Sequence, residues 1–257
     1  MHVIPNEARK RLIVALDVPS LAEATALVRE LAPYVGAFKV GLELLTAEGS
    51  PAVVHALHAL DAHLFYDGKF DDIPNTVAGA ARAVSALNVW MFNVHASAGA
   101  GALAAAVANK GQSLVLAVTV LTSLTDQASR RIFGAPTDAK VLQFARMATE
   151  AGADGVVCSA RELEILRAAP DLDSLATVVP GIRPTWAVAG DQARVMAPRE
   201  AIVAGASAIV VGRPVLHPPA GISRVEAAAL IVEEIQMALG TSHAAPPLPE
   251  SNIHEPS

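Results

Sequence analysis

Residues 63–72 read HLFYDGKFDD, an apolar run that passes directly into a cluster of charges. An apolar run without alternating polar residues is typical of a strand that is covered on both faces, as in a parallel sheet packed between helices. Similar runs recur along the chain, at residues 12–16, 37–40, 63–66, 90–94, 113–120, 155–158, 177–179 and 208–211. The sequence therefore predicts eight parallel strands.

Stretches with helical periodicity lie between most of these runs. Helices are expected over residues 21–31, 138–151 and 160–169. The first follows a Pro-Ser start signal, and the other two are ended by Gly152 and Pro170. Strand and helix alternate about eight times, which predicts an α/β protein with a single-domain (β/α)8 TIM barrel. A doubly wound open sheet has the same alternation and stays the alternative fold.

The predicted barrel occupies residues 11–240, after an N-terminal extension over residues 1–10. Residues 241–257 contain four prolines among small polar residues. Such a composition is typical of a terminus that does not pack. We therefore expect a flexible Pro-rich tail that takes no part in catalysis.

Composition excludes several classes of protein. Of the 257 residues, 53% are hydrophobic and 17% are charged, which is typical of a chain with a large core rather than a disordered one. The 19 Lys and Arg residues against 25 Asp and Glu residues give a net charge of −6, and aromatic residues make up 4%. A nucleic-acid-binding protein needs a basic surface and stacking platforms, so we expect no nucleic-acid partner.

The cellular location is predicted from the single cysteine, from the N-terminal residues and from an uncharged stretch in the middle of the chain. Cys158 has no partner for an intramolecular disulfide, and no Cys/His cluster has the spacing of zinc ligands. The first eleven residues are polar and lack the apolar core of a signal peptide. Residues 83–109 carry no charge, but Asn88, Asn93 and His95 interrupt them, so we expect a buried strand between two helices rather than a membrane span. A cytoplasmic protein without a membrane partner or a metal site is the expectation.

Charged residues gather where the predicted strands end, which in a TIM barrel is the catalytic face. Asp17 ends the first strand, Lys39 lies in the second, and Asp67, Lys69 and Asp72 follow the third. Buried ion pairs contribute little to stability because of their desolvation cost, so a concentration of them is better explained by function.

The third strand carries the candidate catalytic group. Asp67 and Lys69 are two residues apart and so point to the same side, whereas Asp72 lies on the following turn, beyond reach of its own pocket. A lysine between carboxylates stays protonated, because the nearby negative charges offset desolvation. Lys69 is therefore expected to act as a proton donor rather than as a nucleophile.

The last two strands predict a phosphate site. Gly181 and Arg183 follow the seventh strand, and Gly212 and Arg213 follow the eighth. Barrels commonly bind phosphate at this place, where a glycine lets the backbone approach and an arginine matches the oxygens. Gln192, in a glycine-bearing loop, is expected to reach over the same ligand.

Taken together, these motifs resemble the orotidine 5′-phosphate decarboxylase family. The resemblance runs from about residue 11 to about residue 239 and rests on ALD at 15–17, FKVG at 38–41, DGKFDDIPNT at 67–76, NVHAS at 93–97, VLTS at 120–123, PGIRP at 180–184, GDQ at 190–192 and VGRP at 211–214. The Asp-x-Lys-x-x-Asp element is shared with related barrels such as hexulose-phosphate synthases. The other motifs are what make the resemblance specific.

The resemblance implies a homodimeric barrel that removes CO2 from orotidine 5′-phosphate without a cofactor and yields UMP, the last step of pyrimidine synthesis. It implies these roles: Lys69 as proton donor to C6, Asp67 beside the departing carboxylate, Asp17 and Lys39 on the ribose, Asp72 and Thr76 supplied to the partner's pocket, Thr122 or Ser123 facing the pyrimidine, and Arg183, Gln192, Gly212 and Arg213 on the phosphate. Residues 184–190 are the candidate lid.

The sequence departs from the family pattern at two positions. The family often has a larger apolar residue in place of Gly68 and a histidine in place of Asp71.

Two other functions stay open. One is a metal-dependent sugar-phosphate aldolase or synthase of the same superfamily, and the other is a silent phosphate-binding scaffold, which has no reason to hold five coupled charges.

Overall fold

Parallel strands close into a barrel in the order of the chain. The computed structural model describes residues 6–187, 196–240, 245, 248 and 249. The strands are β1 (Leu12–Ala15), β2 (Ala37–Val40), β3 (Leu64–Phe70), β4 (Met91–His95), β5 (Leu114–Val118), β6 (Gly155–Val157), β7 (Ala176–Val179) and β8 (Ala208–Val211). Because β1 pairs with β8 as well as with β2, the sheet has no free edge. The TIM barrel is confirmed, and the open sheet is excluded.

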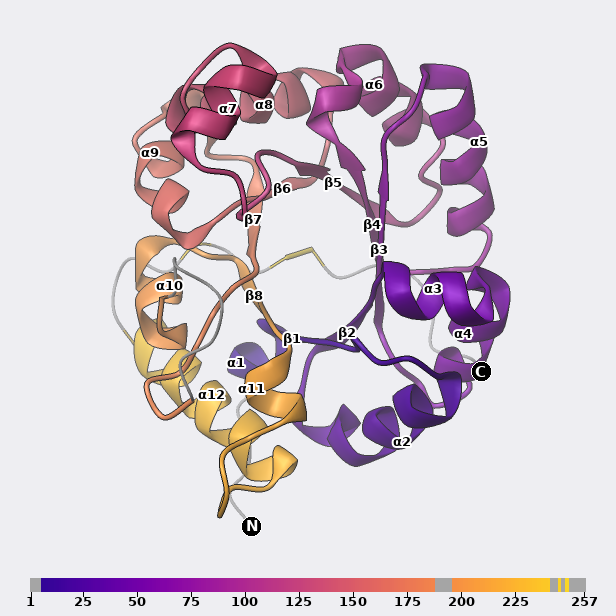
Figure 1. Cartoon of the computed structure of the whole chain (residues 1–257), viewed down its shortest axis with the longest axis vertical. Coiled ribbons are helices and arrows are strands. Elements are labelled where there is room, and N and C mark those ends of the chain that lie inside the picture. The colour runs from indigo at the N-terminus through magenta and orange to yellow at the C-terminus, as the bar shows by residue number, and fades with distance from the viewer. Residues whose placement is uncertain (1–5, 188–195, 241–244, 246–247, 250–257) are drawn as a thin grey trace.

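Helices form a ring around the barrel, and in Figure 1 the colour runs once around this ring from indigo to yellow. The α-helices are α1 (Asn6–Lys10), α2 (Leu21–Leu31), α3 (Leu42–Glu48), α4 (Ser50–His58), α5 (Pro74–Ser85), α6 (Ala100–Ala108), α7 (Asp126–Phe133), α8 (Thr137–Ala151), α9 (Leu163–Arg167), α10 (Pro198–Ala204), α11 (Arg213–Leu216) and α12 (Arg224–Leu239). The 3-10 helices are η1 (Ala32–Tyr34), η2 (Ala96–Ala98), η3 (Ala160–Glu162) and η4 (Pro170–Leu172).

The predicted helices are present, with one difference in type. Helix α2 has the predicted bounds, and the Ser20 hydroxyl accepts a hydrogen bond from the Glu23 N–H at its start. Helix α8 begins one residue before the predicted start. The segment predicted as one helix from residue 160 is instead η3 followed by the short α9. The Glu162 side chain accepts from the Ser159 N–H at 2.8 Å, which tightens this first turn.

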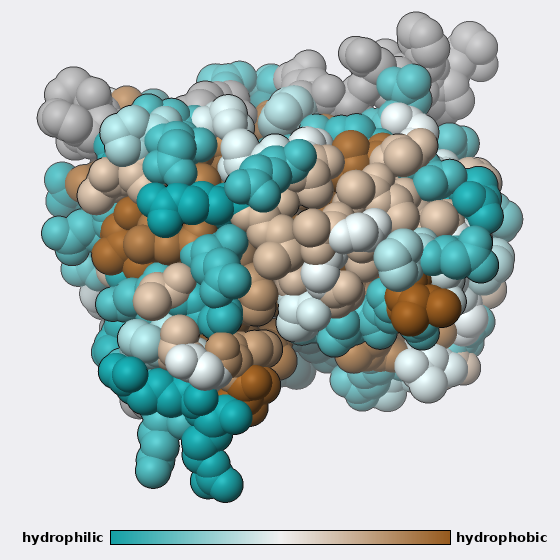
Figure 2. Space-filling model, turned by 90° about the horizontal axis from the view of Figure 1, so that it is seen from above, coloured by the Kyte–Doolittle hydropathy of each residue, from teal (hydrophilic) through white to brown (hydrophobic). Residues whose placement is uncertain are grey.

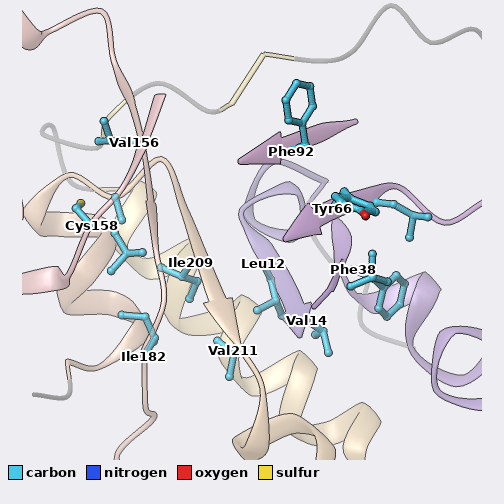
Figure 3. Packing of buried hydrophobic residues seen from close by; sticks show 14 of the residues in the cluster. Leu12, Val14, Phe38, Tyr66, Phe92, Val156, Cys158, Ile182, Ile209 and Val211 are labelled. Carbon is cyan, nitrogen blue, oxygen red and sulfur yellow. The ribbon is translucent and has the colours of Figure 1, made fainter. Parts of the chain in front are cut away.

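Side chains alternate along each strand between two apolar cores. Ile13 and Phe65 belong to the core inside the barrel. Val14, Phe38 and Phe92 belong to the layer between the strands and the helices, part of which Figure 3 shows. The alternation continues to the strand ends, so charged residues in the inward series face the mouth of the barrel.

Strand β3 is longer than the sequence predicts, because it includes the charged segment. It runs to Phe70 rather than ending at Tyr66. Its register against β4 shifts between these two residues, since Tyr66 pairs with Phe92 and Phe70 with Val94. The intervening residues form a bulge, the kind of irregularity that re-aims side chains beside active sites.

The uncharged stretch 83–109 forms the end of α5, β4, η2 and α6, which agrees with the predicted strand between helices. Within the described residues, no helix is both long enough and apolar enough to cross a membrane. Of the predicted N-terminal extension, Asn6–Lys10 form α1, which packs against α12.

The prediction that the tail does not pack is wrong for Leu248 and Pro249. Leu248 is only 7% exposed and belongs to the core inside the barrel. The indole N–H of Trp90, just before β4, donates to the Pro249 carbonyl at 3.1 Å. Leu248 therefore closes the N-terminal end of the barrel, away from the strand ends that carry the charges, because an uncovered barrel end would leave apolar side chains in water.

Leu248→Ala is expected to lower the free energy of unfolding by about 2 kcal/mol, because it removes a buried leucine from a packed core. Met237→Ala is the matched control, since Met237 on α12 is 63% exposed and its truncation should change stability by less than about 0.5 kcal/mol. Urea unfolding of the two variants measures the difference. Equal values would show that the tail contributes no packing energy.

Candidate active site

The C-terminal ends of the strands surround a cavity of about 310 Å³, large enough for a small-molecule substrate. Nine of the residues predicted from the sequence to form the site line it: Asp17, Lys39, Asp67, Lys69, Thr122, Gly181, Arg183, Gly212 and Arg213. Apolar side chains, among them Val118 and Val157, form another part of the wall. The cavity thus combines a charged side with an apolar one.

Four side chains form a row of alternating charge: Asp17 just after β1, Lys39 on β2, and Asp67 and Lys69 on β3. The Lys39 ammonium bridges two carboxylates, with Nζ 3.1 Å from Asp17 Oδ1 and 2.9 Å from Asp67 Oδ2. The Lys69 ammonium lies 2.6 Å from the other oxygen of Asp67. Asp67 is therefore held between two lysines. In the sheet Lys39 pairs with Ala15 and Phe65, so its long side chain reaches to Asp17 and Asp67, each two residues further along its own segment.

The pKa values of Asp67 and Lys39 shift toward their charged forms. Burial alone would raise the pKa of Asp67, but the ammonium groups of Lys39 and Lys69 outweigh it and hold that pKa below its usual value. Burial would likewise lower the pKa of Lys39, but Asp67 and Asp17 outweigh it and the pKa is raised. Each charge stabilises its neighbour, so Asp67 and Lys39 both stay ionised near neutral pH.

Asn93 on β4 joins this row, although the sequence analysis did not select it as a site residue. Its amide N–H donates to Asp67 Oδ1 at 2.6 Å, and its amide oxygen accepts from the Lys69 backbone N–H at 2.8 Å. The available signal was parity, because Asn93 and His95 are the polar residues in the inward series of β4 that starts at Met91.

The loops after β7 and β8 bring two arginines to the cavity. Gly181 has φ +78°, a backbone conformation that favours glycine, and it leads the chain into Arg183. The Arg183 N–H donates to the Met196 carbonyl at 3.0 Å, so the two ends of the loop between these residues meet beside the cavity. Gln192 and residues 188–190 of the candidate lid lie outside the described residues.

Asp72 and Thr76 do not reach their own cavity. Both are exposed, Asp72 on the turn between β3 and α5 and Thr76 in the first turn of α5. Asp72 Oδ1 accepts a local hydrogen bond from the Ile73 N–H, at 2.7 Å. In this structure Asp72 and Thr76 are therefore not among the residues that line the cavity of their own chain.

The remaining candidates separate by position. Thr122 lines the cavity, whereas its neighbour Ser123 is exposed and does not. Cys158 is 1% exposed, and burial raises the pKa of its thiol well above the usual value, so it stays protonated. His95, at the end of β4, has its pKa lowered by burial, with Asp71 opposing the shift.

Among the described residues, no group of three or more His, Cys, Asp or Glu side chains is arranged to hold a metal ion.

Fold and site together define a class of protein. A closed parallel barrel with paired carboxylates and ammonium groups at its mouth, and arginines after the last two strands, is typical of enzymes that act on small phosphorylated substrates. Comparisons with known proteins agree with this class. The sequence model of the orotidine 5′-phosphate decarboxylase / HUMPS family matches residues 10–228, and the chain belongs to this family.

Similar proteins include orotidine 5′-phosphate decarboxylases from several bacteria. The one from Alkalilimnicola ehrlichii is 48% identical over 227 residues, which cover 85% of this chain and 96% of that protein. The one from Moorella thermoacetica is 46% identical over 92% of this chain and 96% of that protein. The crystal structure of orotidine 5′-phosphate decarboxylase from Lactobacillus acidophilus matches with a TM-score of 0.73 at 32% identity, over 87% of this chain and 97% of that one.

Proposed function

We propose that this chain is an orotidine 5′-phosphate decarboxylase, which removes CO2 from orotidine 5′-phosphate and yields UMP without a cofactor. The observation that carries the proposal is the Lys39–Asp67–Lys69 row, with Lys69 Nζ 2.6 Å from Asp67, at the mouth of a cavity that also holds Arg183 and Arg213. The relatives that share this family and most of the chain's length support it.

Lys69 meets the main chemical demand of this reaction. When the bond from C6 to the carboxylate breaks, the electron pair stays on C6 in the plane of the ring, where it cannot delocalise into the carbonyl groups. A fixed ammonium beside C6 offsets this charge as it develops and then delivers a proton to the carbon. The products are UMP and CO2, and Lys69 regains its proton from solvent.

Asp67 has two roles in the proposal. It holds the Lys69 ammonium at 2.6 Å, and its own charge stands where the substrate carboxylate departs. Burial would raise the pKa of Asp67, but the two neighbouring lysines outweigh this effect and lower it. The carboxylate therefore remains charged and repels the substrate carboxylate. Such repulsion adds ground-state destabilisation to the electrostatic effect of Lys69.

The other cavity residues bind parts of the substrate far from C6. In this proposal Asp17 and Lys39 hold the ribose hydroxyls, Thr122 faces the pyrimidine, and Gly212 binds the phosphate together with Arg183 and Arg213; all of them line the cavity. Gln192 would complete the phosphate site. Binding energy from these remote groups is available to order the loops and exclude water around the ring.

A homodimer completes the site in this proposal, because Asp72 and Thr76 are turned away from their own cavity. The surface beside them suits a second copy. Ile73, between them, is 66% exposed. Leu42, the first residue of α3, and Leu121, after β5, are 55% and 41% exposed. Figure 2, which looks from the side of α6 and α8, shows weakly hydrophobic residues in the centre of this face and hydrophilic residues around them. A cytoplasmic location fits the lone, buried Cys158.

The alternative function, a metal-dependent aldolase or synthase of the same superfamily, would need free carboxylates as metal ligands. Here both oxygens of Asp67 contact lysine ammonium groups, and Asp17 contacts Lys39. The row thus fits charge stabilisation at carbon better than a metal-bound enediolate.

An ultraviolet assay with orotidine 5′-phosphate and excess chelator tests the proposed function. We expect the orotate absorbance to fall at the same rate with and without chelator, because no step requires a metal. Activity that disappears with chelator, or appears only with a sugar phosphate and a divalent ion, would favour the metal-dependent alternative. No loss of absorbance by the folded protein would refute the decarboxylase.

A further inference from the structure

We propose that Asn93 is a positioning residue for the reaction: its side chain clamps the Lys69 backbone in a left-handed conformation and orients Asp67, and so places the Lys69 ammonium. This inference rests on the proposed function for its kinetic consequence. The clamp itself is a statement about the contacts between β3 and β4 and does not depend on the reaction.

The Asn93 side chain is built into the barrel wall. It is 1% exposed, and both ends of its amide are used. The amide oxygen accepts from the Lys69 N–H at 2.8 Å, and the amide N–H donates to Asp67 Oδ1 at 2.6 Å. One side chain on β4 thus ties together the two residues of β3 that the proposed chemistry uses, across the bulge where the two strands leave register.

The Lys69 backbone needs such a clamp. Its φ is +48°, a left-handed value that costs free energy for any residue with a Cβ. Residues held this way persist where surrounding contacts over-determine them, and they cluster at active sites. The shift in ladder register leaves the Lys69 N–H bonded to the Asn93 amide. Without that bond, φ would relax to negative values and the side chain would point elsewhere.

The second bond of Asn93 orients the carboxylate. Asp67 Oδ1 accepts from both Asn93 and the Lys69 ammonium, while Oδ2 lies 2.9 Å from Lys39. The Asn93 N–H therefore fixes the rotation of the carboxylate that sets the place of Nζ. Because proton delivery to C6 depends on that place, loss of Asn93 should act on the chemical step more than on binding.

Asn93→Ala removes both bonds, and Asn93→Leu removes them while keeping most of the volume, in case a cavity prevents folding. We expect kcat to fall about 10- to 100-fold in both, the effect of a misplaced reacting group. We expect KM and the affinity for UMP to change by less than about threefold, because the proposed phosphate and ribose contacts are untouched.

Ser113→Ala is the matched control. Ser113 is also a buried polar residue with a 2.6 Å hydrogen bond, to the Val89 carbonyl, but it lies just before β5 at the opposite end of the barrel. Its variant should lose stability and keep kcat. A kcat loss in Asn93→Ala no larger than in this control, or a loss confined to KM, would overturn the positioning role.

A crystal structure of Asn93→Ala tests the clamp independently of activity. We expect Lys69 to leave the left-handed region and its ammonium to separate from Asp67. An unchanged Lys69 backbone would overturn the inference even if the protein proves to be a decarboxylase. If the native protein has no decarboxylase activity, the proposed function fails, while this structural outcome still decides the clamp.

Discussion

Lys69→Ala should lose turnover of orotidine 5′-phosphate by about 10⁴-fold or more. The variant removes both the charge that stabilises the C6 carbanion and the proton that ends it, and each of these effects contributes several orders of magnitude in enzymes. The fold should survive, because Asp67 keeps its contacts with Lys39 and Asn93. UMP should bind within about tenfold of the native affinity, since its proposed binding groups remain.

Lys110→Ala is the matched control for this prediction. Lys110 is another partly exposed lysine in an ion pair, 2.6 Å from Asp154, and its side chain is 25% exposed against 30% for Lys69. It lies near the N-terminal end of β5, where Asp154 also accepts from the Val115 N–H. Lys110→Ala should affect stability and leave turnover unchanged. A kcat within about tenfold of native in Lys69→Ala would remove that lysine from the mechanism.

Mixing two inactive variants should restore activity if Asp72 serves the partner's site. Asp72→Ala alone should lower turnover at least about 10³-fold, because the variant removes a charge from a preorganised site. In a hybrid dimer of Asp72→Ala with Lys69→Ala, one site receives both defects and the other receives neither. Random pairing makes half of the dimers hybrid, so about a quarter of native activity should return.

Co-expression of the two chains with different tags allows the hybrid to be isolated, and the isolated hybrid, with one intact site of two, should show about half of native activity. The control pairs Asp72→Ala with a chain carrying both substitutions, which leaves a defect in every site and should stay inactive. If Asp72 acted in its own cavity, each site of the first hybrid would carry one defect and no activity would return. Native turnover by the Asp72→Ala protein would show that this carboxylate has no part in the site.

Local sequence patterns were sufficient for much of the fold. The apolar runs match the strands because a strand covered on both faces must be apolar throughout. Helix α2 has the predicted bounds because its signals are local, with a capping serine at its start. In contrast, strand β3 was predicted to end four residues too early, since its pairing with β4 continues past the charged segment. A cross-strand pairing is not encoded in any short window of sequence.

The packing of the C-terminal tail was also not predictable from local sequence. Its proline-rich composition is typical of an unpacked terminus, but Leu248 is buried in the barrel core and Trp90 holds Pro249. A single apolar residue gives no periodic signal. Its burial depends on an open barrel end, and that end exists only after the strands close.

The sequence alone determined which chemical groups the site contains, because Asp17, Lys39, Asp67 and Lys69 follow or lie in strands whose ends must meet in a closed barrel. The tertiary structure decided how these groups are held. Pairing of β2 with both β1 and β3 placed Lys39 between two carboxylates, and the register shift between β3 and β4 brought the Asn93 amide to the left-handed Lys69 backbone. Such contacts join residues that are distant in the chain, and their geometry depends on strand register and backbone conformation, which local propensity does not specify.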